Sequence, residues 1–369
     1  MTTLLYYILG CAVNGTSVDA LRLKDLTAEE WGELYLLGKK QGVTGVLFEQ
    51  IQKLPKEVAP PRELLLRWMS HTMSVEHQTK ERFQRSAEFA ELMSNHGLHT
   101  LVLKGLALSG YYPNLWHREY GDLDCYLYEE KEGLFSWTGC YERGNQIAEQ
   151  AGFEIERDYY KHSHIKFNGL EIENHQFSLP IKDSEEVRAL ELELRRLIEK
   201  PNAARRIGKT HLMMPSADFN ALFFTAHAMS HFLFESIRVR HVLDWAMFLK
   251  KEQDHVDWNN FWMWCDRMHY TRFVRCLNYI CSHYLEMELC SSLNVEDSAE
   301  ITRLSERMMQ DILSGYSIYT TGHTGLQHRL DIAVSYMKGL WKFRDVYQRN
   351  AFWLLLKRVK NYWKKDVKL

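Results

Sequence analysis

A β-rich block between about residues 97 and 182 interrupts a chain whose apolar periodicity is otherwise helical. A block of this length holds only a few short strands, which favours a small mixed sheet covered by helices. The runs Leu98–Leu103 and Leu123–Tyr128 are expected to be strands of this sheet. The dipeptide Asn168-Gly169 lies between two apolar runs and predicts a β-hairpin. We therefore expect an α+β fold that is predominantly helical.

The pattern divides the chain into three regions. We expect an N-terminal helical region over residues 1–95, an α/β core over residues 96–182 and a C-terminal helical domain over residues 183–369. In the first region, Thr27 and Glu30 have the spacing of a capping box and predict the start of a helix. In the third, the charged residues between about 185 and 196 are expected to form a solvated helix face.

Composition narrows the classes of protein. Lys and Arg total 46 against 48 Asp and Glu, for a net charge of −2, which argues against a protein that coats nucleic acid over its whole surface. Seven cysteines occur without a Cys-x-x-Cys pair, as is typical of reduced core thiols rather than a zinc ribbon or a disulfide scaffold. No apolar run reaches the roughly 18 residues of a membrane span. A cytoplasmic location is the expectation.

Asp122 and Asp124 are the strongest candidates for a chemical site. Residues i and i+2 of a strand point to the same face, so the two carboxylates project side by side. They repel unless a cation compensates them, and Mg²⁺ is typically held by such carboxylates together with substrate phosphates. Lys104 and Gly105 end the preceding strand, where an ammonium group and a backbone turn can face phosphates. Arg118 can add a further phosphate contact.

The strand after Asn168-Gly169 supplies a third acidic residue. Its alternation places Glu171, Glu173 and His175 on one face. A third carboxylate beside the first pair is what a two-metal site needs, because both the attacking and the leaving oxygen must be stabilised. An Asp-x-Asp pair by itself is also common on ordinary protein surfaces. The prediction therefore depends on finding Lys104 and Glu173 in addition to the two aspartates.

This combination resembles the uncharacterised bacterial nucleotidyltransferases of the DNA polymerase β superfamily. Members have a strand ending in Leu-Lys-Gly, an Arg shortly before a Gly-Asp-hydrophobic-Asp strand, and a Glu-x-His strand. The corresponding residues here are Leu103-Lys104-Gly105, Arg118 with Gly121-Asp122-Leu123-Asp124, and Glu173-Asn174-His175. The resemblance extends over most of residues 1–260 and implies a nucleotidyltransferase core for the mixed sheet.

The resemblance also implies roles. Asp122 and Asp124 would hold Mg²⁺ or Mn²⁺, and Glu173 would be the third acidic ligand or the base. Lys104 and Gly105 would contact the phosphates of ATP or another NTP. The implied reaction moves a nucleoside monophosphate from an NTP to an acceptor hydroxyl by two-metal catalysis. The acceptor stays open between a protein, a sugar, a small molecule and an RNA end.

Two alternatives stay open beside this function. One is a degenerate nucleotidyltransferase scaffold that binds a nucleotide or a partner protein without turnover. The other is a helical interaction protein in which Asp122 and Asp124 are incidental. Metal-dependent nucleotide binding would separate both the nucleotidyltransferase and the degenerate scaffold from the helical interaction protein. Release of pyrophosphate would separate the active nucleotidyltransferase from the degenerate scaffold.

Further residues are candidates for lining the cleft. His227 and His231 share one helix face at i and i+4, which suits a polar core contact, a nucleotide cleft or a metal, although the intervening Glu of a His-Glu-x-x-His motif is missing. Arg240 and Asp244 follow in the part of the chain that carries the resemblance, and His175 completes this group.

The C-terminal segment from Lys357 to Leu369 is basic and carries interleaved aromatic residues. We expect either a last helix that docks on the C-terminal domain or a weak contact with an anionic surface, a membrane or nucleic acid.

Overall fold

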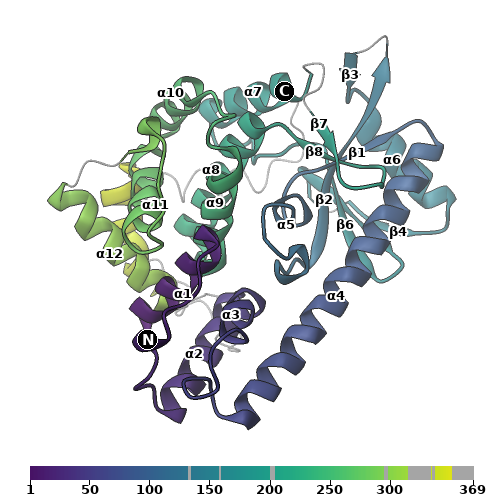
Figure 1. The fold of residues 1–369 in the computed structure, drawn as a ribbon. Helices are drawn as coiled ribbons and strands as arrows, with labels where there is room; N and C mark the ends of the chain where they lie inside the picture. Colours follow the sequence, from purple (N-terminus) through teal and green to yellow (C-terminus); the bar gives the residue numbers. More distant parts are fainter. Residues whose placement is uncertain are drawn as a thin grey trace.

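The computed structural model describes residues 1–131, 134–157, 159–199, 204–294, 298–314, 334 and 337–350. In Figure 1 a sheet and its covering helices lie on one side, and a bundle of helices from the C-terminal half lies on the other. The basic segment 357–369 lies outside the described residues, so its two readings stay predictions.

The α-helices, in chain order, are α1 (Thr2–Asn14), α2 (Ala28–Gln41), α3 (Thr44–Ile51), α4 (Arg62–Asn95), α5 (Leu106–Ser109), α6 (Cys140–Gln150), α7 (Glu185–Glu199), α8 (Ala217–Phe234), α9 (Val239–Glu252), α10 (Trp258–Met268), α11 (Thr271–His283) and α12 (Ala299–Ser314). The shorter helical turns are η1 (Ala20–Arg22), η2 (Leu115–His117), η3 (Ser291–Leu293) and η5 (Lys342–Tyr347). The strands are β1 (His99–Val102), β2 (Asp122–Lys131), β3 (Leu134–Ser136), β4 (Glu154–Glu156), β5 (His162–Phe167), β6 (Leu170–His175), β7 (Ala204–Arg206) and β8 (Leu212–Pro215).

Local sequence signals explain several of these boundaries. The Thr27 side chain accepts a hydrogen bond from the backbone N–H of Glu30, and the Glu30 side chain accepts one from the Thr27 backbone, so the predicted capping box is confirmed. Helix α2 ends at Gly42, whose left-handed φ of 69° suits glycine. At the tip of the β5–β6 hairpin, Asn168 and Gly169 have φ of 48° and 79°, as a type I′ turn requires.

The strands form one mixed sheet of the order β4-β5-β6-β2-β1-β8-β7, with β3 paired to β2. Strand β2 is antiparallel to β1 and parallel to β6. The fold is therefore α+β and predominantly helical, as predicted from the periodicity.

Strands β7 and β8 were not expected, because the sequence after residue 183 was interpreted as helical throughout. After α7 the chain returns to the sheet, where β8 pairs in parallel with β1 and β7 pairs with β8. These strands are three and four residues long, too short for a period-2 pattern to show in the sequence. Pairing with β1, rather than local preference, makes them extended.

The two faces of the sheet have different neighbours. On one face, apolar residues of β2 and β6, such as Leu123 and Ile172, pack with Phe89 of α4 and Ile147 of α6. Alternation along β2 then places Asp122 and its i+2 neighbour on the opposite face. This second face lies toward α8 and α9, which belong to the helical half of the molecule (Figure 1).

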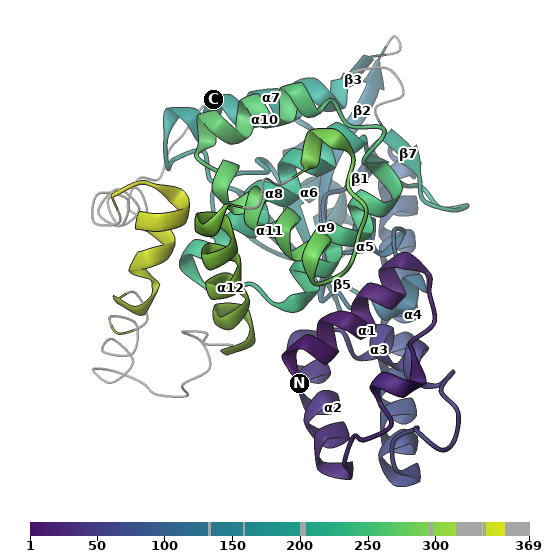
Figure 2. The ribbon, with the colours of Figure 1, turned by 60° about the vertical axis from the view of Figure 1, so that its left-hand side comes forward.

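Helix α1 packs on α3 and on α9, so the N-terminus of the chain lies against the C-terminal helices (Figure 2). The Asn14 side chain donates a hydrogen bond of 2.8 Å to the Leu285 carbonyl. A Cβ at Gly10 would lie 2.7 Å from the same backbone oxygen, a position that cannot yield as a flexible side chain can. The close approach of these two backbones therefore requires glycine at position 10.

Replacing Gly10 by Ala is expected to lower the free energy of unfolding by about 1–3 kcal/mol, the usual cost of overpacking. Gly32→Ala is the matched control, because Gly32 lies within α2 with nothing within 4 Å of its added Cβ. It should stabilise the protein by up to about 1 kcal/mol through helix propensity. Urea unfolding measures both; equal midpoints for the two variants would contradict the close approach at Leu285.

Candidate active site

The strand register brings the predicted acidic residues together. Asp124 on β2 lies opposite Glu173 on β6, and Asp122 lies opposite Glu171. On the next strand, His162 lies opposite His175. These side chains occupy the sheet face that α4 and α6 leave free.

Lys104 and two histidines contact the acidic cluster Asp122, Asp124 and Glu173. Lys104 Nζ lies 2.9 Å from Asp124 Oδ1, and the Asp124 side chain is only 1% exposed. His175 Nε2 lies 3.0 Å from the same oxygen and 3.2 Å from Glu173 Oε2. His162 Nδ1 lies 3.0 Å from Glu173 Oε2. Each side chain of this group contacts at least one other. The group consists of Lys104, Asp124, His162, Glu173 and His175.

Burial and neighbouring charges set the protonation of this network. Burial raises the pKa of Asp122, and the Asp124 carboxylate raises it further. Burial opposes the charged form of Lys104, but the nearby carboxylates outweigh it and raise the pKa of its ammonium. Burial likewise opposes ionisation of Glu173, yet the His162 and His175 rings hold its pKa far below the usual range. Glu173 is thus a fixed carboxylate.

The donor set fits a divalent cation. Asp122, Asp124 and Glu173 each offer a carboxylate oxygen, and these oxygens lie within 4.8 Å of one another. Asp124 Oδ2 is buried and has no hydrogen-bond partner among the described residues. A buried carboxylate oxygen without a partner is costly unless a cation or a proton donor reaches it. Hard oxygen donors of this kind suit Mg²⁺ or Mn²⁺.

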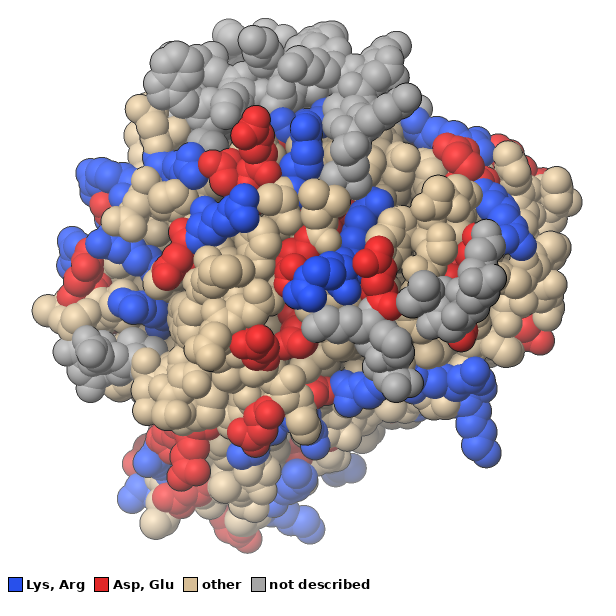
Figure 3. Space-filling model, turned by 90° about the horizontal axis from the view of Figure 1, so that it is seen from above, with Lys and Arg blue, Asp and Glu red and all other residues tan. Residues whose placement is uncertain are grey.

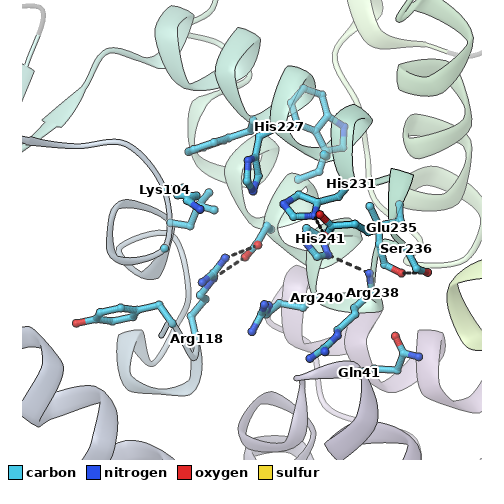
Figure 4. A pocket seen from close by; sticks show the side chains of 18 of the residues that line it. Gln41, Lys104, Arg118, His227, His231, Glu235, Ser236, Arg238, Arg240 and His241 are labelled. Atoms are coloured by element: carbon cyan, nitrogen blue, oxygen red, sulfur yellow. Dashed lines mark hydrogen bonds and ion pairs between the residues drawn. The ribbon is translucent and has the colours of Figure 1, made fainter. Parts of the chain in front are cut away.

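A pocket of about 550 Å³ lies beside the cluster, and Lys104, Gly105 and Asp122 are among the residues that line it. Figure 4 shows Lys104 and Arg118 on one side of this pocket and His227, His231 and Arg240 on the other. Most charged side chains around it are basic. The lining includes Lys40, Lys104, Arg118, Arg238 and Arg240, with His227, His231 and His241, against Asp122, Glu235 and Asp244.

Gly105 shapes the entrance of the pocket. Its φ is 56°, and a Cβ there would lie 3.2 Å from Cβ of Tyr120. Glycine at position 105 therefore permits the turn after β1 and also lets the backbone pass close to Tyr120, just before β2. The predicted phosphate contact of Gly105 stays a prediction.

Arg118 and Arg240 differ in their partners. The Arg118 guanidinium donates two hydrogen bonds to Asp244, of 3.0 and 2.8 Å, and Tyr112 donates a third to the same carboxylate. Arg240 donates only a 3.3 Å hydrogen bond to the Glu119 carbonyl, and its Nε has no partner within the described part of the chain. Burial and the adjacent Arg118 lower the pKa of Arg240. Arg240 therefore has fewer protein acceptors than Arg118.

The predicted histidine pair lies in the pocket wall on α8. The His227 and His231 rings are 4.4 Å apart between centroids, and His231 Nδ1 lies 2.7 Å from Glu235 Oε2. Burial and the nearby Lys104 hold the pKa of His227 well below its usual value. His227 thus presents a neutral imidazole opposite the acidic cluster, which suits a cleft-lining role.

Three nearby groups were missed by sequence reasoning. Lys161 precedes β5, and burial together with Lys104 lowers the pKa of its ammonium. His162 follows it, and His241 lies across the pocket with its pKa lowered to about 3 by burial and by Arg240. The alternation of His162 and His164 before the Asn-Gly turn was a usable signal for the first histidine; Lys161 and His241 gave none.

The outer surface carries no comparable concentration of one charge on the face seen in Figure 3, where basic and acidic side chains are interspersed. This agrees with the near-neutral composition.

The family described as uncharacterised nucleotidyltransferase matches residues 27–286. Because this match covers most of the chain and contains the whole acidic cluster, the chain belongs to that nucleotidyltransferase family. No curated protein and no solved structure matches the chain. Within the described residues, no helix combines the length and the apolar character needed to cross a membrane.

Proposed function

We propose that this protein transfers a nucleoside monophosphate from an NTP to a hydroxyl group of an acceptor. The observation that supports it most is that Asp122, one of the three residues of the acidic cluster, lines a pocket whose charged side chains are mainly basic. Carboxylates that hold cations and basic groups that bind phosphates are both needed to bind a triphosphate.

The chain's own residues have distinct tasks in this proposal. Asp122 and Asp124 hold Mg²⁺ or Mn²⁺, which when bound neutralises phosphate charge and favours ionisation of the acceptor hydroxyl. Glu173 serves as a ligand rather than a base, because its lowered pKa makes it a poor proton acceptor. Lys104 and Gly105 contact the phosphates from one side of the pocket, and Arg240 binds them from the other.

Arg118 acts mainly by positioning. Its two hydrogen bonds to Asp244 hold its guanidinium in place, whereas the less exposed of the other two pocket arginines, Arg240, has no carboxylate at hydrogen-bond distance among the described residues. The proposed acceptor is a hydroxyl group of a protein, a sugar, a small molecule or an RNA end. We also propose a cytoplasmic location, in keeping with seven cysteines that form no disulfide.

The first test is thermal unfolding with each NTP, with and without Mg²⁺. An NTP at about 100 times its dissociation constant adds roughly 2.7 kcal/mol to the free energy of unfolding, a shift of several degrees. The proposal expects a shift for at least one NTP only when Mg²⁺ is present. An equal shift without Mg²⁺, or none with any NTP, would count against the acidic cluster as the binding site.

Arg240→Met is expected to weaken binding of that NTP by about 10–100-fold, since it removes a charge-assisted contact of roughly 1.5–3 kcal/mol. Arg238→Met is the matched control, because Arg238 lines the same pocket but is exposed. Calorimetric titration with Mg²⁺ present measures both. Equal loss in the two variants would show a general charge effect and contradict a specific role of Arg240.

One contact favours a second candidate function. Lys104 Nζ occupies the Asp124 oxygen at 2.9 Å, so an ammonium group can neutralise the cluster in place of a metal. A scaffold without catalysis, binding a nucleotide or a protein, would keep this ion pair. Pyrophosphate release separates the two functions. Mg²⁺-dependent release of pyrophosphate from a bound NTP supports transfer, whereas nucleotide binding without any release supports the scaffold.

A further inference from the structure

A group of two histidines and one glutamate lies beside the acidic cluster and has a different chemistry. His162, Glu173 and His175 each offer a donor atom, and these atoms lie within 4.8 Å of one another. The side chains of His162 and His175 are 11% and 1% exposed, and that of Glu173 is 15% exposed. The group is therefore nearly enclosed but open to solvent at Glu173.

The orientation of His175 is fixed by the backbone. Its Nδ1 lies 3.0 Å from the Phe177 carbonyl oxygen, which can only accept, so Nδ1 carries a hydrogen. In the neutral ring the lone pair is then on Nε2, which faces Asp124 and Glu173. A histidine that donates one nitrogen to a carbonyl and presents the other to a ligand site is the usual arrangement of a metal-binding histidine.

The lone pair needs a cation. Nε2 of His175 lies 3.0 Å from one carboxylate oxygen and 3.2 Å from another, contacts that repel if nothing positive lies between them. His162 Nδ1 has no aligned hydrogen bond within the described residues, although Glu173 Oε2 is 3.0 Å away. A divalent cation among the three donors would remove this repulsion and would give the buried His162 Nδ1 a partner.

The spacing of the donors suits a metal. Ligands at about 2.1 Å from a metal lie roughly 3.0–3.4 Å from one another in octahedral or tetrahedral coordination. The two distances from Glu173 Oε2, 3.0 Å to His162 and 3.2 Å to His175, match that spacing. Imidazole nitrogen favours zinc-like transition metals, whereas Mg²⁺ prefers oxygen throughout.

We propose that His162, Glu173 and His175 form a binding site for a divalent transition metal of the Zn²⁺ type. It shares Glu173 with the oxygen-donor group Asp122, Asp124 and Glu173, so both sites would use that carboxylate. The site follows from its own donors and does not depend on nucleotidyl transfer.

Co²⁺ titration of the metal-free full-length protein tests this site, because Co²⁺ reports nitrogen ligation through its visible absorption. We expect one equivalent to bind, Zn²⁺ to displace it, and millimolar Mg²⁺ to leave it in place. His162→Gln and His175→Gln should each weaken Co²⁺ binding by at least about 100-fold, more than the roughly 10–100-fold typical of an outer-shell partner.

His164→Gln is the matched control. His164 is on the same strand two residues on, and it contacts the exposed Glu171 instead of Glu173. Its Co²⁺ affinity should equal that of wild type. Because His175 is buried and its replacement can impair folding, far-ultraviolet circular dichroism accompanies each variant, and His162→Gln decides if His175→Gln does not fold.

Asp122→Asn separates this site from the proposed function. It should keep the Co²⁺ absorption while losing Mg²⁺-dependent NTP binding. No Co²⁺ absorption in wild type, displacement by Mg²⁺, or unchanged affinity in His162→Gln would overturn the transition-metal site and leave the nucleotide site untouched. Loss of NTP binding by itself, with the Co²⁺ absorption intact, would count against the function alone.

Discussion

Asp122→Asn should reduce Mg²⁺-dependent nucleotide turnover by at least about 10²–10³-fold, the loss seen when one electrostatic contact to a reacting group is removed. The amide keeps the size of the side chain but removes the negative charge that holds a cation. Asp122 already has a raised pKa because of burial and the nearby Asp124, so removing its charge relieves repulsion. The fold should therefore persist, and pyrophosphate release measures the effect.

Glu171→Gln is the matched control for Asp122→Asn. Glu171 lies opposite Asp122 in the strand register and on the same face, but its side chain is 56% exposed and contacts His164. Turnover in this variant should stay close to wild type. Full turnover in Asp122→Asn, or an equal loss in both variants, would contradict the assignment of Asp122 as a metal ligand.

The second large effect is expected at Asp244, which links the core to α9. Its carboxylate accepts two hydrogen bonds from Arg118 and one from Tyr112, and the ion pair is 8% and 9% exposed. Asp244→Ala leaves the Arg118 charge buried next to Arg240, so the free energy of unfolding should fall by about 3–5 kcal/mol. Urea unfolding measures the loss.

Two comparisons test whether the loss comes from the buried charge. Arg118→Met combined with Asp244→Leu removes both charges and should recover much of the stability. Glu149→Ala breaks a solvent-exposed pair with Arg157 and should cost under about 1 kcal/mol. If Asp244→Ala lowers the free energy of unfolding by no more than Glu149→Ala does, the buried Arg118–Asp244 ion pair does not stabilise this part of the fold.

The contribution of Asp244 depends on pH in a defined direction. Burial opposes its ionisation, but Arg118 outweighs this and lowers its pKa. A lowered pKa in the folded state gives stability that is fully present above the unfolded value of about 3.9 and is lost as the pH falls through the folded value. The difference between wild type and Asp244→Ala should therefore shrink in strong acid.

The parts of the fold that follow from short-range signals were predictable. The capping box at Thr27 and the Asn168-Gly169 turn depend only on neighbouring residues, and both are present in the structure. The shared face of Asp122 and Asp124 follows from the period of a strand. Glu173 was expected beside them from the alternation of the strand after Asn168-Gly169, and the parallel pairing of β2 with β6 brings it there.

The parts that depend on distant contacts were not predictable. Glu191 was interpreted as part of a solvated helix face, but it is fully buried and accepts hydrogen bonds from Tyr126 and from the Leu179 backbone. A charged residue at helical spacing gives the same pattern in both cases, so only tertiary packing distinguishes them. Strand β8 is extended for a similar reason, because β1 is its partner.

The partner of Arg118 also lay beyond sequence reasoning. Arg118 was expected to contact phosphates, and Asp244 was only a candidate for lining the cleft. The structure joins them across 126 positions of the chain, which leaves Arg240 in the pocket with an unpartnered Nε among the described residues. A role of Arg118 toward phosphates stays a prediction.

In the proposed reaction the α-phosphate of an NTP passes to an acceptor. Incubating the protein with Mg²⁺, an extract that supplies acceptors, and each NTP labelled at either the α- or the γ-phosphate measures this directly, with Asp122→Asn as the blank. We expect the α-label on an acceptor and the γ-label in released pyrophosphate. Transfer of the γ-label, or no transfer of the α-label beyond the Asp122→Asn blank with any NTP, would contradict nucleotidyl transfer.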